Sequence, residues 1–187
     1  SDYGVYARRF DANGTALGGE FQVNTYTTNK QLWSSVAMND SGQFIITWTS
    51  ADQDGSSWGI YAQLYKADGK PQGSEFRVNT QIASDQLFSS VAMNDTGQFV
   101  ITWTSRDQDG SGTGIFAQRY DANGNAVGQE FQVNTHTAGD QITSSVAMSD
   151  SGEFVITWTS DQQDSSGQGI YAQRYNANGN PTGSEFR

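Results

Sequence analysis

The sequence repeats itself with a period of 55 residues and without insertions or deletions between copies. Residues 35–49 return almost letter for letter as residues 90–104 and again as residues 145–159. A fixed period close to the range of roughly 20–50 residues is typical of solenoids, propellers and arrays. The fold is therefore expected to be one small unit stacked on copies of itself.

Each unit is predicted to be a four-stranded antiparallel meander. A first strand ends at the turn 39–42, where Gly42 supplies the left-handed backbone that a tight hairpin needs. The second strand, 44–49, is apolar on both faces, so both should be covered. A longer connection leads to a third strand at 59–65, and another tight turn leads to a fourth strand at 75–80.

Stacked units of this kind predict an all-β, propeller-like fold with about 3.5 blades per chain. The alternative is a linear stack of small β-sheets. Only 16% of the residues are charged, and two are proline, which suits short strands joined by turns. We expect one repeat domain over residues 1–187. It comprises a partial unit of two strands plus a connecting loop (1–34), unit 1 (35–89), unit 2 (90–144) and unit 3 with a truncated last strand (145–187).

An incomplete number of blades predicts self-association. Closed rings have about 4–8 blades, so closure would need a second copy, and a homodimer is the expected assembly. The chain starts and stops within a unit, which we interpret as a piece of a longer array or a deliberately chosen number of units.

Charge and hydropathy exclude two kinds of partner. A net charge of −10 argues against nucleic acid, which requires clustered positive charge. No apolar run approaches the ~20 residues of a membrane-spanning helix, so no membrane insertion is expected. The sequence contains no cysteine, which removes disulfides and thiol chemistry.

Several repeated motifs resemble those of a known repeat class. They are Phe-Gln-Val-Asn-Thr at 21–25, Ser-Ser-Val-Ala-Met at 34–38, Phe-Val-Ile-Thr-Trp-Thr-Ser at 99–105 and Asp-Gln-Asp-Gly-Ser at 52–56. With these motifs the whole chain resembles the tandem β-repeats of large secreted bacterial proteins, which are adhesin-like and linked to calcium-binding toxin-type repeats. The resemblance implies a secreted or cell-surface bacterial protein and implies no catalytic residues.

The long loops are the predicted binding surface. In a meander they share one end of the sheets, and they vary between copies while the strands hardly change. Flat aromatic rings beside carboxylates suit a sugar, and a protein on a cell surface is the other expected ligand. Two alternatives are that the loop sequences vary because nothing constrains them, and that the aromatic rings only fill gaps between blades. The candidate ligand-binding residues are Trp33, Trp58, Asp52, Asp54 and Phe88.

Carboxylates at alternate positions before a glycine suggest a Ca²⁺ site, the one cofactor considered. The candidate ligands are Asp52, Asp54, Asp107 and Asp109. Oxygen ligands suit this hard cation, but a full calcium loop needs about six to eight of them. The alternative is an Asx-type turn, in which the carboxylates accept hydrogen bonds from backbone N–H groups.

The predicted function is a non-catalytic binding or adhesion module. The only histidine, His136, has no counterpart in other copies and no nucleophile beside it, so an enzyme is not expected. The alternative function is a structural spacer or self-assembling fragment, stabilised by Ca²⁺.

Overall fold

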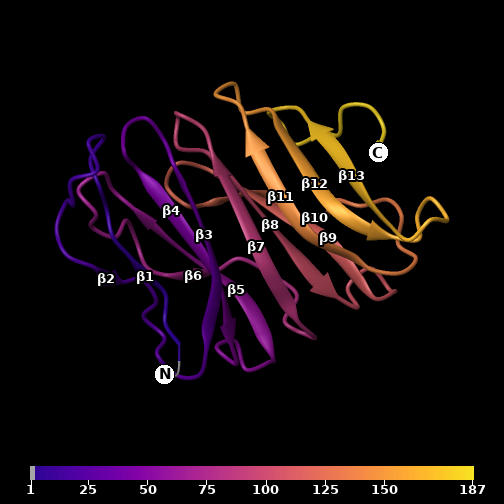
Figure 1. Ribbon diagram of the computed structural model, residues 1–187, viewed down its shortest axis with the longest axis horizontal. Helices are drawn as coiled ribbons and strands as arrows, with labels where there is room; N and C mark the ends of the chain where they lie inside the picture. The colour runs from indigo at the N-terminus through magenta and orange to yellow at the C-terminus, as the bar shows by residue number, and fades with distance from the viewer. Residues whose placement is uncertain (1–2) are drawn as a thin grey trace.

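The computed structural model describes residues 3–187 and is an all-β stack of small antiparallel sheets (Figure 1). This confirms the predicted fold class. Within these residues there is no helix, and hence none long and apolar enough to cross a membrane. The strands are β1 (Tyr6–Ala7), β2 (Phe21–Gln22), β3 (Gln31–Met38), β4 (Phe44–Ala51), β5 (Trp58–Tyr65), β6 (Phe76–Arg77), β7 (Gln86–Met93), β8 (Phe99–Arg106), β9 (Thr113–Tyr120), β10 (Ala126–Gln132), β11 (Gln141–Met148), β12 (Phe154–Asp161) and β13 (Gln168–Tyr175).

Each sheet follows the order of the chain, as a meander requires. One sheet contains β3-β4-β5-β6, the next β7-β8-β9-β10, and the third β11-β12-β13. In the third sheet Phe186 bridges to Ala172, at the place of a fourth strand. The N-terminal sheet contains only β1 and β2, which correspond by repeat position to β5 and β6.

The tight turns form where the sequence places asparagine and glycine. Asn39 accepts a hydrogen bond from the Gly42 N–H at 2.9 Å through its backbone carbonyl. Its side-chain Oδ1 accepts one from the Gln43 N–H at 2.9 Å. Gly42 has a φ of 81°, a left-handed conformation that costs glycine little. The turn therefore fixes the register of the β3-β4 hairpin.

The core lies between successive sheets. Phe44, Ile46 and Trp48 of β4 pack toward the N-terminal unit, and Ile45 packs toward the following sheet. This confirms the expectation that the strand at 44–49 is covered on both faces. Trp48 is 0% exposed, and its repeat counterparts Trp103 and Trp158 are 0% and 1% exposed. Each large buried apolar side chain contributes about 1.5–3 kcal/mol, so these seams hold the stack together.

A glutamate in each complete unit ties it to the unit before. Glu130 accepts hydrogen bonds from the Thr80 N–H at 2.7 Å and from the Gln108 amide at 2.6 Å. Glu75 and Glu185 accept the equivalent bonds from Thr25 and Thr135. Because the bonds repeat, adjacent sheets keep the same spacing along the chain.

Residues 3–187 do not form a closed ring, because the first and last sheets lie at opposite ends of the molecule (Figure 1). The stack of small sheets, one of the two architectures expected, therefore describes this chain. Ring closure by a homodimer and the unit boundaries at residues 34, 89 and 144 stay predictions. Residues 1–2 of the predicted partial unit lie outside the described range.

Candidate functional site

The long loops are joined to one another at one end of the sheets. Loops between units donate hydrogen bonds to loops within units, from Asn29 to Asp52 at 3.1 Å and from Ser84 to Asp107 at 3.2 Å. Ser57 donates in the other direction, to Asp85. These bonds join the loops into a single layer, which can hold side chains in fixed positions.

A β-bulge in the first strand of each of the three larger sheets turns one side chain toward this layer. Leu32 pairs with Thr49 and Ser35 with Thr47, so Trp33 and its neighbour oppose a single residue of β4. Trp33 has a φ of 53°, and its counterparts Phe88 and Thr143 both have a φ of 57°. Positive φ is uncommon for bulky residues and marks a position that the surrounding structure holds in place.

The bulges bring together three aromatic rings from two neighbouring sheets. The ring of Trp33 lies 4.6 Å from that of Phe88 and 5.7 Å from that of Trp58. Trp33 is 46% exposed and Phe88 is 38% exposed. We call Trp33, Trp58 and Phe88 the aromatic cluster. Its rings meet across the seam between two sheets and still present apolar surface to solvent.

A pocket of about 370 Å³ adjoins the aromatic cluster. Phe88 forms part of its wall, and Asp85, Arg106, Asp107 and Asp140 contribute charged groups. We call it the loop pocket. The Arg106 Nε lies 4.0 Å from the Asp85 Oδ2, and the Asp140 Oδ1 accepts a hydrogen bond from the Thr113 N–H at 3.1 Å. The pocket can therefore offer both carboxylate acceptors and one guanidinium donor beside an aromatic ring.

The sequence analysis missed Asp85, Arg106 and Asp140. Arg106 stands where the other units have Ala51 and Asp161, so its variation between copies was the available signal. These residues come from three separate segments, namely the connection before β7, the end of β8 and the connection before β11, and repeat spacing alone does not reveal that they converge.

The two predicted carboxylate acceptors of unit 1 have different environments. Asp52 is exposed, and its Oδ2 accepts the hydrogen bond from Asn29. The Asp54 side chain is only 1% exposed. It accepts a hydrogen bond from the Ser56 N–H at 3.1 Å, and its Oδ2 lies 4.0 Å from the Arg77 Nη1. As the loop stands, Asp52 is accessible to a ligand and Asp54 is not.

The second pair of predicted metal ligands repeats this arrangement. Asp107 accepts the hydrogen bond from Ser84, while Asp109 accepts one from the Ser111 N–H at 3.1 Å. The bonds to Asp54 and Asp109 are those of the Asx-type alternative. Across residues 3–187, no group of three or more His, Cys, Asp or Glu is placed to hold a metal ion. A Ca²⁺ site at these four aspartates stays a prediction, and melting with Ca²⁺ against chelator tests it.

Burial, and after it the negative charge of Asp54, raise the pKa of Tyr61, which lies behind this loop, to about 12. The phenol therefore stays protonated at physiological pH.

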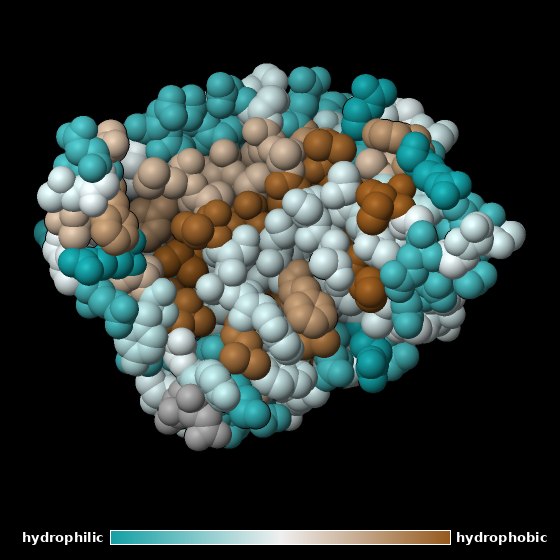
Figure 2. Space-filling view, in the orientation of Figure 1, coloured by the Kyte–Doolittle hydropathy of each residue, from teal (hydrophilic) through white to brown (hydrophobic). Residues whose placement is uncertain are grey.

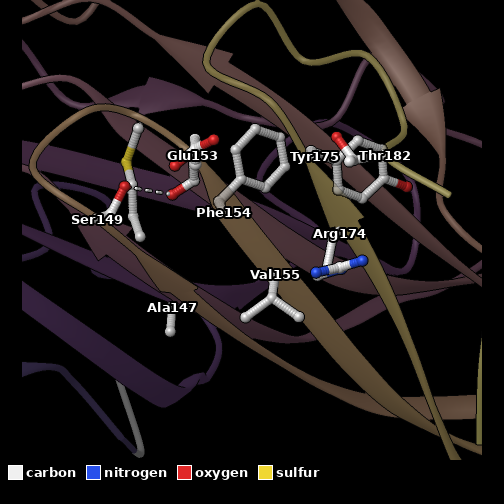
Figure 3. Close-up of a pocket in the computed structure, with 9 residues that line it drawn as sticks. Ala147, Ser149, Glu153, Phe154, Val155, Arg174, Tyr175 and Thr182 are labelled. Carbon is white, nitrogen blue, oxygen red and sulfur yellow. Dashed lines mark hydrogen bonds between the residues drawn. The ribbon is translucent and has the colours of Figure 1, made fainter.

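Another pocket, of about 440 Å³, lies on the sheet β11-β12-β13 (Figure 3). Arg174 lies in it, and the Ser149 hydroxyl donates a hydrogen bond to the Glu153 carbonyl at 3.2 Å. Arg174 has the repeat position of Arg119, which donates to turn carbonyls of the next unit at Ala177 and Asn178. By repeat position this pocket thus matches a surface that packs on a neighbouring unit elsewhere in the stack, and the aromatic cluster with the loop pocket is the candidate site.

No protein-family model and no curated protein sequence matches this chain. Its fold is similar to an endo-arabinase from Bacteroides thetaiotaomicron, with a TM-score of 0.54 and 12% identity over 88% of this chain and 66% of that one. It is also similar to an endo-1,4-beta-xylanase from the same organism, with a TM-score of 0.53 and 12% identity over 85% of this chain and 60% of that one. The chain therefore spans less than two thirds of either enzyme.

A fucose lectin from Kordia zhangzhouensis has a TM-score of 0.46 and 11% identity over 82% of this chain and 95% of that one, a likeness too distant to carry an argument. The structural neighbours of this repeated antiparallel β-sheet fold with a TM-score above 0.5 thus include the two carbohydrate-active enzymes. At these identities the likeness shows the fold alone and does not separate an enzyme from a binding module. The resemblance to adhesin-type repeats stays a prediction.

Proposed function

We propose that this chain is a non-catalytic, glycan-binding module of a secreted or cell-surface bacterial protein. The observation that carries the proposal is the aromatic cluster, in which bulges at equivalent positions of two sheets bring Trp33 and Phe88 together while leaving both exposed. Exposed aromatic rings in fixed positions offer a surface on which the apolar face of a sugar ring can stack.

The loop pocket supplies the polar half of the site. Its carboxylates at Asp107 and Asp140 are exposed and can accept hydrogen bonds from sugar hydroxyls. The net charge of −10 repels anionic saccharides, so a neutral glycan is the ligand we favour over a charged one or a surface protein. The names of the two enzymes that share the fold agree with a carbohydrate-related role.

Binding to a panel of neutral glycans, with point variants of the cluster, tests the proposal. Trp33→Ala removes the most exposed ring, and we expect it to weaken binding about tenfold or more without loss of folding. Val127→Ala is the control, because Val127 is 37% exposed and lies in β10, the strand of its sheet farthest from β7 and Phe88. Unchanged affinity in the Trp33 variant would remove the proposed site.

We also propose that the exposed end sheets associate, so that two copies form a homodimer. Ile170 is 61% exposed, whereas its repeat counterparts Ile60 and Ile115 are covered by a following unit and 0% exposed. The burial of such a face is favourable. Light scattering should then give a mass about twice 20.3 kDa, and a monomer at all concentrations would contradict the dimer.

A further inference from the structure

Two seams between neighbouring sheets differ in the aromatic rings at their long-loop end. We call the seam between β3-β4-β5-β6 and β7-β8-β9-β10 the first seam, and the seam between β7-β8-β9-β10 and β11-β12-β13 the second seam. Trp33, Trp58 and Phe88 meet in the first seam. At the same repeat positions the second seam has Phe88, Thr113 and Thr143. It therefore has one ring where the first seam has three.

The loop pocket lies where a ring is missing from the second seam. Thr113 and Phe88 both line it, and they have the repeat positions of Trp58 and Trp33. The rings of Trp58 and Trp33 lie 5.7 Å apart. A tryptophan at 113 would by the same geometry direct its ring toward Phe88 and into the pocket. The pocket is thus the space that an indole fills one unit earlier.

Polar groups at the rim of the loop pocket remain able to bind a ligand. The Asp107 Oδ2 accepts a hydrogen bond from Ser84, and the Asp140 Oδ1 accepts from the N–H and the hydroxyl of Thr113. Both carboxylates are exposed and have a second oxygen, so acceptor capacity is left over. The Arg106 side chain is 58% exposed, which leaves its guanidinium accessible as a donor.

A sugar ring fits this wall better than an aromatic ring. The apolar face of a sugar stacks on Phe88, and its hydroxyls donate to Asp107 and Asp140, whereas an aromatic hydrocarbon would leave both carboxylates without a new donor. Figure 2 shows the same border over the whole molecule, with hydrophilic residues, in teal, along the rim and apolar residues, in brown, on the face. The volume of about 370 Å³ lies within the roughly 300–1,000 Å³ of small-molecule sites.

Phe88 connects the loop pocket to the aromatic cluster. It lines the pocket, and its ring lies 4.6 Å from that of Trp33 across the first seam. Phe88 is 38% exposed and Trp33 is 46% exposed, so apolar ring surface continues from one seam to the next. A glycan with one ring in the pocket can therefore extend over Phe88 to Trp33.

We propose that the loop pocket takes one whole sugar ring in the place of the missing indole, while the next sugar of the chain stacks on Trp33. The smallest unit that the site recognises in full is then a disaccharide of a neutral glycan. This inference rests on the proposed glycan-binding function and adds to it the size of the ligand. It also makes Thr113 the residue that sets this size, because threonine leaves the pocket open and tryptophan would close it.

Closing the pocket with Thr113→Trp tests the proposal. The probes are the methyl glycosides of glucose, galactose, xylose and arabinose, with disaccharides of the same sugars, titrated into the whole chain by calorimetry. We expect the parent to bind its best disaccharide about tenfold or more tighter than the matching methyl glycoside. Thr113→Trp should reduce this ratio to about threefold or less. The variant should fold, because β5 begins with tryptophan at the same repeat position.

Val127→Trp is the control for the added side chain. Val127 is 37% exposed and lies in β10, the strand of the same sheet farthest from β7 and Phe88, so this variant should keep the ratio of the parent. A parent that shows no preference for disaccharides, or a Thr113→Trp variant that keeps the preference, would overturn the proposal.

Trp33→Ala separates this inference from the function on which it rests. If none of the probes binds, or if Trp33→Ala leaves their affinity unchanged, the glycan-binding function itself is wrong. If Trp33→Ala weakens binding while Thr113→Trp keeps the preference for disaccharides, the glycan site stands and the role of the loop pocket is refuted.

Discussion

The residue that faces the buried carboxylate of each long loop is arginine in two units and glutamine in one. Arg77 Nη1 lies 4.0 Å from Asp54 Oδ2, and Arg187 Nη1 lies 2.7 Å from Asp164 Oδ2. Gln132 stands at the same repeat position in unit 2, so within residues 3–187 the buried Asp109 Oδ2 has no such arginine beside it. We therefore expect Gln132→Arg to stabilise the fold.

The size of the expected gain in stability follows from how exposed the arginine and the aspartate are. The Arg77 side chain is 39% exposed, so a guanidinium at this position keeps part of its hydration while it meets a buried carboxylate. An exposed ion pair contributes about 0.2–1 kcal/mol, and a hydrogen bond to a charged group about 1.5–3 kcal/mol. We expect about 1 kcal/mol for the new pair, which raises Tm by about 2–4 °C in a chain of this size.

Thermal and denaturant unfolding followed by circular dichroism measure this gain. Asp109→Asn in the same chain is the control, since it removes the charge that the new arginine would meet. Arg77→Gln, which gives unit 1 the residue that unit 2 has at this position, should lower the free energy of unfolding by a similar amount. The reasoning is refuted if Gln132→Arg melts at or below the parent, or if its gain survives Asp109→Asn.

Two further predictions concern the seams between units and the buried phenols. Glu130→Gln should lower the free energy of unfolding by about 1–3 kcal/mol, because it weakens the bonds to Thr80 and Gln108. Glu20→Gln, the same change in the partial unit where Glu20 is exposed, should stay within about 0.5 kcal/mol in denaturant unfolding, and equal losses would contradict the assignment. Burial raises the pKa of Tyr61 and Tyr65 to about 12, so stability is fully present below the unfolded pKa of about 10 and falls as pH rises from about 10 toward 12. Urea midpoints at pH 9, 10 and 11 check this, and a constant midpoint would show that these phenols ionise in the folded chain.

The repeat made the scaffold predictable from the sequence. Apolar residues on both faces of 44–49 predicted that both faces would be covered, and both are buried in seams because identical units must pack on each other. Asparagine and glycine also favour the backbone conformation of a tight turn, so the hairpin turn at 39–42 could be predicted from the sequence.

The candidate site was only partly predictable. Trp33 and Phe88 were identified by their variation between copies, but nothing in the sequence around them signals a bulge with positive φ, because tryptophan and phenylalanine are not turn residues. Asp54 was predicted as a ligand-binding residue, yet it is buried under its own loop. Asp109 is buried in the same way although Gln132 replaces the arginine, so the burial comes from the fold of the loop, which local sequence does not reveal.

The most direct test of the glycan-binding proposal is a titration followed by the indole N–H signals of the five tryptophans in a ¹H–¹⁵N spectrum. Trp48, Trp103 and Trp158 are 0%, 0% and 1% exposed and serve as internal controls. The account predicts that a neutral glycan that binds shifts the signals of Trp33 and Trp58 and leaves the three core signals in place. A glycan that binds while the Trp33 and Trp58 signals stay unmoved would contradict it.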